Sequence, residues 1–211
     1  TYGSAVYGVN ATMITIEVTV VQGLRFFMVG LPDSAVKESE QRVEASLKFF
    51  NYKMPRQKVV VNLAPADIRK EGSAYDLPIA LCVLQSSEQI TTERNLEEYV
   101  IMGELSLDGN LRPIKGVLPI AIEARRLGYK GFVLPAENAQ EAAIVNNIDV
   151  IPVETMQEAV EFFEGKRDII PLTVDTRDIF FSSQNEYEAD FAHVQGQENI
   201  KRALEITAAG G

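Results

Sequence analysis

The chain has little of what most metal and catalytic sites need. Its 211 residues include one cysteine (Cys82), one histidine (His193) and no tryptophan. A single thiol cannot close an internal disulfide, and one cysteine with one histidine cannot supply a zinc site. A Ser-His-Asp triad would depend on His193, and no G-x-S-x-G sequence accompanies it. These two classes of site are therefore excluded, and Cys82, inside an apolar run, is predicted to be a buried small hydrophobe.

Long apolar runs and excess positive charge are also missing. No stretch reaches the roughly 18 apolar residues of a membrane span, and the first residues lack the pattern of a secretory signal. We therefore predict a cytoplasmic protein without a membrane segment. The formal net charge is −10, and phosphate neutralisation needs clustered Lys and Arg. Any contact with nucleic acid must therefore be local.

The first half of the chain reads as rich in hairpins. Residues 12–21 alternate β-branched apolar and polar side chains, as in a half-buried strand, and residues 25–31 read as its hairpin partner. A helix is predicted to begin after Asp33, which suits the N-cap position. A buried strand is expected at 58–63. An apolar helix follows at 76–84, with Asp76 as its expected N-cap.

The second half alternates strands and helices, a pattern typical of parallel or mixed sheets. We predict strands at 99–105, 131–134 and 149–153, a hairpin turn at 107–110, and helices at 116–127, 138–145 and 155–163. The two halves together predict an α/β sandwich (α+β in its arrangement) with a mixed sheet and helices.

Composition divides the chain into three parts. Residues 1–165 carry the regular periodicity of one domain. Residues 166–190 are polar and acidic and read as a linker, while 191–211 regain a helical pattern at 197–208.

Several separated blocks carry a family resemblance. They are V-G-L-P-D-S-A-V-K-E-S at 29–39, V-N-L-A-P-A-D-I-R-K-E-G at 61–72, D-L-P-I-A-L at 76–81 and G-E-L-S-L-D-G-N-L-R-P-I-K-G at 103–116. In this order the first three resemble the N-terminal part of the Mg-chelatase-like AAA+ family of the ComM/YifB type, while residues 61–81 together with 103–116 resemble the proteolytic domain of Lon. The resemblance implies the fold of the Lon proteolytic domain for residues 1–165 and the start of an AAA+ ATPase module at 191–211.

The resemblance also implies a nucleotide site. The V-x-G-Q pattern of Val194, Gly196 and Gln197 resembles the segment that lines the adenine pocket of AAA+ proteins. No G-x-x-x-x-G-K-[ST] loop occurs in the chain, so this fragment is not expected to hold ATP. The family's phosphate loop is expected shortly after Gly211, and the parent protein is expected to use ATP and Mg²⁺. By the same resemblance, the parent is a homo-oligomeric ring, a hexamer, that binds branched or single-stranded DNA and drives branch migration.

The residues with which Lon cuts peptides are missing. Lon uses a Ser-Lys dyad, in which the lysine activates the serine. Placed on the matching blocks, the serine position falls on Ala74 and the lysine position on Leu118. The fragment is thus expected to be inactive as a protease. One alternative is a displaced dyad of Ser73 with Lys70 or Lys115, and another is a metal-insertion role of the magnesium-chelatase kind.

The densest basic stretch is K-F-F-N-Y-K-M-P-R-Q-K at 48–58. Lysines and arginine interleaved with aromatic rings suit a single-strand groove. We take Lys53, Arg56 and Lys58 as candidate DNA-binding residues. Arg69 and Lys70 form a second basic point at the other end of the 58–63 strand, about 20 Å away at ~3.3 Å per residue.

Overall fold

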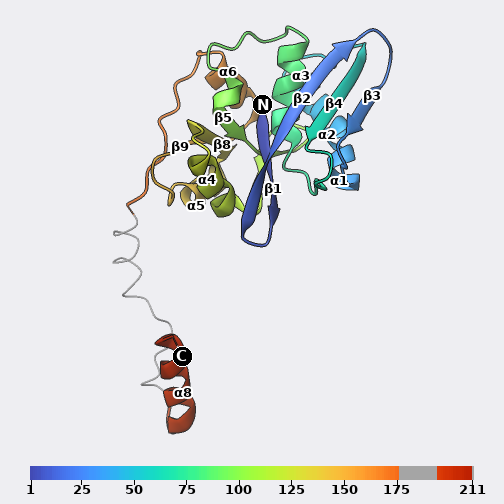
Figure 1. Ribbon diagram of the computed structural model, residues 1–211. Helices are drawn as coiled ribbons and strands as arrows, with labels where there is room; N and C mark the ends of the chain where they lie inside the picture. The colour runs from blue at the N-terminus through green and yellow to red at the C-terminus, as the bar shows by residue number, and fades with distance from the viewer. Residues whose placement is uncertain (176–193, 211) are drawn as a thin grey trace. The chain divides into compact units, whose positions relative to one another are not determined.

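The computed structural model describes residues 1–175 and 194–210 (Figure 1). Residues Thr1–Val174 form one compact unit, and the described residues after Val174 belong to a second. The strands are β1 (Tyr2–Tyr7), β2 (Asn10–Val21), β3 (Phe26–Val29), β4 (Lys58–Ala64), β5 (Tyr99–Ile101), β6 (Glu104–Leu105), β7 (Leu111–Arg112), β8 (Gly131–Pro135) and β9 (Asp149–Val153). The α-helices are α1 (Ser34–Lys37), α2 (Ser39–Phe49), α3 (Asp76–Ser86), α4 (Val117–Arg126), α5 (Ala139–Ala142), α6 (Met156–Phe163) and, in the second unit, α8 (Glu198–Ala208).

A seven-stranded mixed sheet organises the first unit, in the order β3-β4-β2-β1-β5-β8-β9. Strand β1 pairs antiparallel with β2, and β2 pairs antiparallel with β4. On the other side, β5, β8 and β9 are parallel to one another, because α4 and α5 return the chain between successive strands. A separate two-stranded ribbon joins β6 to β7. The predicted α/β fold with a mixed sheet is confirmed.

Two strand assignments from the sequence were wrong or missing. Strand β3 is not a hairpin partner of β2; it lies parallel to β4, with Phe26 opposite Val59, and forms the edge of the sheet. Alternation of apolar residues marks a strand but does not choose its partner, and here β4 lies between β2 and β3. The central strand β1 was not predicted at all.

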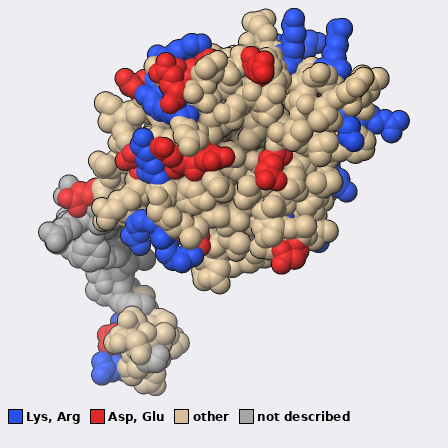
Figure 2. Space-filling view, turned by 45° about the horizontal axis from the view of Figure 1, so that its top comes forward, with Lys and Arg blue, Asp and Glu red and all other residues tan. Residues whose placement is uncertain are grey.

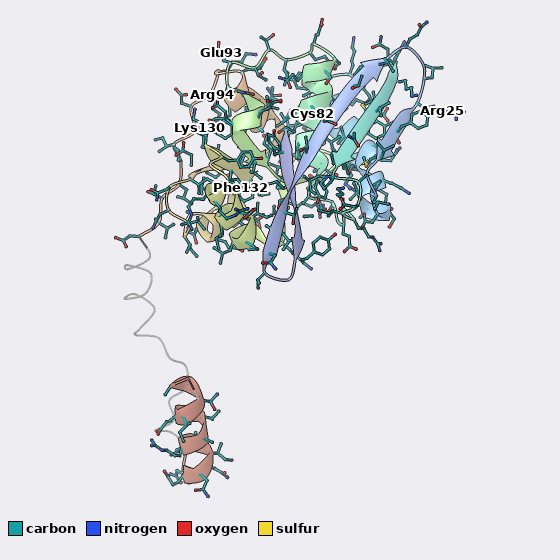
Figure 3. The ribbon with its side chains drawn as sticks, in the orientation of Figure 1. Arg25, Cys82, Glu93, Arg94, Lys130 and Phe132 are labelled. Carbon is teal, nitrogen blue, oxygen red and sulfur yellow. The ribbon has the colours of Figure 1, made fainter. Side chains whose placement is uncertain are left out.

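Helix α3 forms the centre of the core. Every residue from Asp76 to Leu84 is buried, and the helix packs against β2 and α2. Cys82 lies among them with 6% exposure, which confirms its predicted role (Figure 3). Asp33 caps α1 as expected, accepting from the Val36 N–H at 2.8 Å. Asp76, however, is not the N-cap of α3, because Tyr75 occupies that position and Asp76 stands in the first turn.

The strand predicted at 99–105 is interrupted. The Met102 N–H still donates to Val133 O in the sheet, but the Gly103 N–H donates to Ala74 O and Gly103 O accepts from the Leu77 N–H. The chain therefore leaves β5 to bond with the start of α3, and resumes as β6. The helix predicted at 138–145 is likewise shorter and is limited to α5 after one 3₁₀ turn.

The first part of the predicted 166–190 linker packs on the first unit. The Leu172 N–H donates to Val150 O at 2.9 Å, and Ile169, Leu172 and Val174 contact the core. Residues 176–190 of that linker, and His193, lie outside the described residues. Among the described residues, none of the helices has the length and apolar character needed to cross a membrane.

Candidate functional site

The loop between α2 and β4 is fixed through its backbone. After α2 ends, Asn51 takes a φ of 64° and turns the chain. The Lys53 N–H donates to Gln89 Oε1 at 2.8 Å, and Gln89 Nε2 donates to Lys53 O at 2.8 Å. Because one side-chain amide binds both groups, the loop is held against the end of α3. The Lys53 side chain is left exposed to solvent.

A cavity of about 820 Å³ lies beside this loop. Its charged lining consists of Lys48, Lys53, Arg56 and a single carboxylate, Glu44. The remaining lining is neutral: Tyr52, Met54, Pro55, Gln57, Ser87 and Gln89. The structure thus brings two of the three predicted residues, Lys53 and Arg56, together with Lys48 around one concave surface. Three cations against one anion make this a local positive site on an acidic protein.

These cations are not neutralised by partners. Elsewhere in the described chain, exposed Lys and Arg side chains often form ion pairs, such as Lys130 with Glu98 and Arg167 with Glu158. Within residues 1–175 and 194–210, Lys48, Lys53 and Arg56 form none. Figure 2 shows Lys and Arg gathered on the side of the first unit that carries β3 and β4, with few acidic groups beside them.

Lys58, the third predicted residue, lies elsewhere. It begins β4 opposite Val21, and its Nζ stands 4.8 Å from the centre of the Phe27 ring, a cation–π contact. Lys58 does not line the cavity of Lys53 and Arg56. Side chains alternate between the two faces of a strand, so sequence proximity to Arg56 did not settle where Lys58 points.

The second basic point is largely neutralised. Arg69 pairs with Glu71 at 3.2 Å. Lys70 is fully buried and its Nζ donates to Pro65 O, and burial lowers its pKa. Lys70 is therefore unavailable to an external phosphate, and the expectation of a second basic point there was wrong for this residue.

The loop that corresponds to Lon's catalytic serine has a different chemistry. Ser73 Oγ donates to a Glu104 carboxylate oxygen, and Lys70 is occupied by Pro65 O. Exposed Lys115 does line the same cavity as Ser73, of about 520 Å³, together with Asp33, Glu71 and Glu104. In a Ser-Lys dyad, the serine hydroxyl donates its proton to a neutral lysine amine. Here the Ser73 hydroxyl donates to a carboxylate instead. Ala74 and Leu118, at the two positions assigned to the dyad from the sequence, have side chains that can supply neither a nucleophile nor a base.

Sequence reasoning missed the buried polar network under this loop. The Asp76 carboxylate accepts from Arg42 Nε at 2.6 Å, from Ser39 Oγ at 2.5 Å and from the Leu105 N–H at 3.1 Å. Burial raises the pKa of Asp76, while the bonds from Arg42 and Ser39 oppose that rise. The network joins α2, α3 and β6. One sequence signal pointed to it: Ser39 and Arg42 lie three residues apart and so share a helix face.

The predicted nucleotide-binding residues belong to the second unit. Val194, Gly196 and Gln197 are exposed, and Gln197 takes a φ of 60° as the N-cap of α8. A nucleotide also needs a phosphate cradle, and the sequence has no such loop. The residues present therefore do not fit ATP by themselves, and their assignment stays a prediction.

A family model described as "ChlI: Subunit ChlI of Mg-chelatase" matches residues 16–138. The YifB protein of Salmonella typhimurium is 43% identical over 209 residues, which cover 98% of this chain and 40% of YifB. Competence protein ComM of Haemophilus influenzae is 36% identical over 210 residues, 99% of this chain and 41% of ComM. The chain thus spans about 40% of the length of these relatives.

Two matches are shorter. DNA repair protein RadA of Halalkalibacterium halodurans is 33% identical over 113 residues, 54% of this chain and 24% of RadA. Lon protease 2 of Bacillus subtilis is 28% identical over 130 residues, 61% of this chain and 23% of that protease, which agrees with the expected Lon-like fold. Since the family model covers more than half of the chain and relatives match nearly all of it, the chain belongs to the Mg-chelatase-like family of the ComM/YifB type.

Proposed function

We propose that the first unit is a non-catalytic, DNA-guiding module of an ATP-driven AAA+ protein. The observation that carries the proposal is the cavity in which Lys48, Lys53 and Arg56 converge without ion-pair partners in the described chain. Cations that are not already paired can replace the counterions of a phosphate backbone, and the release of those counterions favours binding. The similarity to a DNA repair protein supports the same choice of ligand.

The wider role in this proposal is that of the whole protein. It is a cytoplasmic homo-oligomeric ring, a hexamer, that hydrolyses ATP with Mg²⁺ and drives branch migration of DNA. In a ring, the basic cavity of each subunit recurs around the axis, and a strand can pass from one to the next. Hydrolysis takes place outside this chain's own residues, which offer no phosphate cradle. The chain's contribution is to hold the strand.

Nucleic-acid binding by the 211-residue chain tests the first part of the proposal. The measurement is fluorescence anisotropy of a labelled four-way junction and of a labelled single strand, over a range of salt concentrations. Lys53→Ala/Arg56→Ala is expected to weaken binding at least tenfold. If both residues contact phosphates, the double substitution also makes the plot of log affinity against log salt concentration less steep. For a single strand, the slope changes by about 1.4, at ~0.7 per phosphate contact.

Arg112→Ala/Arg125→Ala is the matched control. It removes two exposed cations that also form no ion pair within the described residues but lie outside the cavity. An equal loss of affinity in the two double variants would mean that only net charge matters, and the cavity would not be the site.

The motor function needs a separate test, in which ATP hydrolysis by the full-length protein is measured with and without the junction. A rate indifferent to DNA would contradict the branch-migration role.

A second candidate, a Ser-Lys peptidase, is favoured by one observation: Ser73 and Lys115 line the same cavity. The bond from Ser73 to Glu104 weighs against it, because a carboxylate at that position stabilises the hydroxyl rather than the attacking alkoxide. Incubation with an unfolded protein substrate decides between the two. Cleavage that Ser73→Ala abolishes would establish the peptidase, and no cleavage by the unmodified chain would remove it.

A further inference from the structure

The four residues Met54, Pro55, Arg56 and Gln57, here called the ridge, separate two cavities. One is the basic cavity of about 820 Å³ described above, and the other is smaller, about 150 Å³. All four ridge residues line both cavities. Arg56, exposed at this position, is therefore within reach of a ligand on either side.

The smaller cavity contains a cation that the sequence did not single out. Arg25, in the connection between β2 and β3, lines it together with Arg56. Arg25 is exposed and lies at the outer edge of the sheet (Figure 3). Like the cations of the larger cavity, it forms no ion pair within the described chain. The single carboxylate here is Glu40, so the second side of the ridge is also locally positive.

The backbone of Arg25 is strained. Its φ is 110°, a conformation that side-chain-bearing residues rarely adopt and that glycine adopts readily. The Val59 N–H donates to Arg25 O at 3.0 Å and fixes the residue against β4. Residues kept in such conformations cluster at binding sites, where the strain positions a side chain. Glycine does occur in this connection, at Gly23, but the position with a φ of 110° carries an arginine.

Apart from Gln57 and the three charged residues, the lining of the smaller cavity is apolar. Leu24, Phe26, Met54, Pro55 and Val59 line it. Apolar side chains next to cations suit a flat base with its phosphate, as in single-strand sites. A cavity of about 150 Å³ is too small for a base pair, and the bases of a duplex are paired and stacked inside it.

We propose that a single strand of nucleic acid crosses the ridge, with phosphates on Lys48 and Lys53 in the larger cavity, on Arg56 at the crest, and on Arg25 beyond it. A base unstacked at the crossing occupies the smaller cavity. The inference rests on the proposed function and narrows its ligand from DNA in general to a single strand. It also adds Arg25 as a binding residue.

Arg25→Gly provides a sharp test because it removes the cation and relieves the strain together. The 211-residue chain is titrated into a labelled oligothymidylate, and thermal unfolding is recorded in parallel. The variant is expected to bind about three- to tenfold more weakly while melting no lower than the unmodified chain. A residue with a merely structural role would show the opposite pattern, with a lower melting temperature and unchanged affinity. Arg125→Ala, at a distant exposed cation, is expected to leave affinity unchanged.

The remaining outcomes separate this inference from the proposed function. If Lys53→Ala/Arg56→Ala weakens binding and Arg25→Gly does not, the strand stays in the larger cavity and the crossing is wrong. If a blunt duplex of the same length binds as tightly as the single strand, the preference for a single strand is wrong. If neither binds and an acidic peptide does, both this inference and the DNA-guiding function are overturned.

Discussion

Arg42 and Asp76 form a bidentate ion pair across the interface of α2 and α3. Arg42 Nε donates to Asp76 Oδ2 at 2.6 Å, and Nη2 donates to Oδ1 at 3.0 Å. The Asp76 side chain is fully buried, and the Arg42 side chain is 19% exposed. With Ser39 and the Leu105 N–H, the pair satisfies a carboxylate that would otherwise be expensive to bury. It holds the start of α3 beneath the loop that contains Ser73.

Removing one partner of this pair should lower the free energy of unfolding far more than removing both. Asp76→Ala leaves the mostly buried Arg42 guanidinium with only the exposed Glu38 carboxylate, 3.7 Å away, as an ion-pair partner, and is expected to lower the free energy of unfolding by about 3–5 kcal/mol. Arg42→Met/Asp76→Leu should cost less than either single change, because it leaves no uncompensated charge. Urea denaturation measures all three. Glu98→Gln, in the exposed pair with Lys130, is the control and should cost at most about 1 kcal/mol.

Tyr75 should make the fold sensitive to alkaline pH. Its ring is 1% exposed and its hydroxyl donates to Ser4 O at 3.0 Å, and burial raises its pKa well above the ordinary value. The folded state therefore keeps the phenol proton that the unfolded state releases above about pH 10. Stability is fully present below that pH and falls above it, by up to ~1.4 kcal/mol per pH unit.

Tyr75→Phe should flatten this dependence. Urea midpoints at about pH 8 and about pH 11, on either side of the unfolded tyrosine pKa, measure the effect. At the lower pH the variant should lose about 1 kcal/mol for the missing hydrogen bond. Tyr7→Phe, at a half-exposed tyrosine, is the control. An unchanged alkaline loss in Tyr75→Phe would assign the effect to other groups.

Gly30 allows β3 to approach β4 before α1 begins. Its φ is 99°, and a Cβ there would lie 2.0 Å from Leu63 O in β4. Gly30→Ala is expected to cost about 3–5 kcal/mol, from left-handed backbone strain plus a steric clash. Gly72→Ala separates these two terms, since Gly72 has a φ of 82° but open space around it. Gly72→Ala should lower the free energy of unfolding by only about 1–2 kcal/mol. An equal loss in the two variants would contradict the steric clash at Gly30.

Gln89 acts on the basic cavity through the backbone of Lys53. Gln89→Ala removes both hydrogen bonds to that residue and is expected to increase amide hydrogen exchange at Lys53. If the loop positions the cations, single-strand affinity should fall about fivefold, the equivalent of ~1 kcal/mol of lost hydrogen bonding. Gln85→Ala, at a glutamine whose side chain donates to Thr92 Oγ1, is the matched control. Faster exchange with unchanged affinity would show that the clamp is structural only.

The local elements were largely predictable from the chain. The Asp33 cap, the apolar helix that became α3, and the strand-helix alternation after residue 99 depend on neighbouring residues, so periodicity and capping preferences reveal them. The expected loss of the Lon dyad also rests on the sequence alone, because the positions assigned to it hold Ala74 and Leu118, whose side chains cannot act as nucleophile and base. Family membership follows from the same order of residues.

Tertiary structure decided which of these pieces meet. Edge strand β3 pairs with β4 because α2 and the loop after it return the chain beside it, a non-local choice that alternation cannot encode. Asp76 became a buried ion-pair partner instead of a helix cap because α2 brings Arg42 to it. Lys53 and Arg56 converge on a cavity while Lys58 turns to Phe27, and Arg25 joins Arg56 from a distant connection. The sequence specified which residues carry charge; only packing between segments far apart in the chain determined which charges are buried, paired or left free for a ligand.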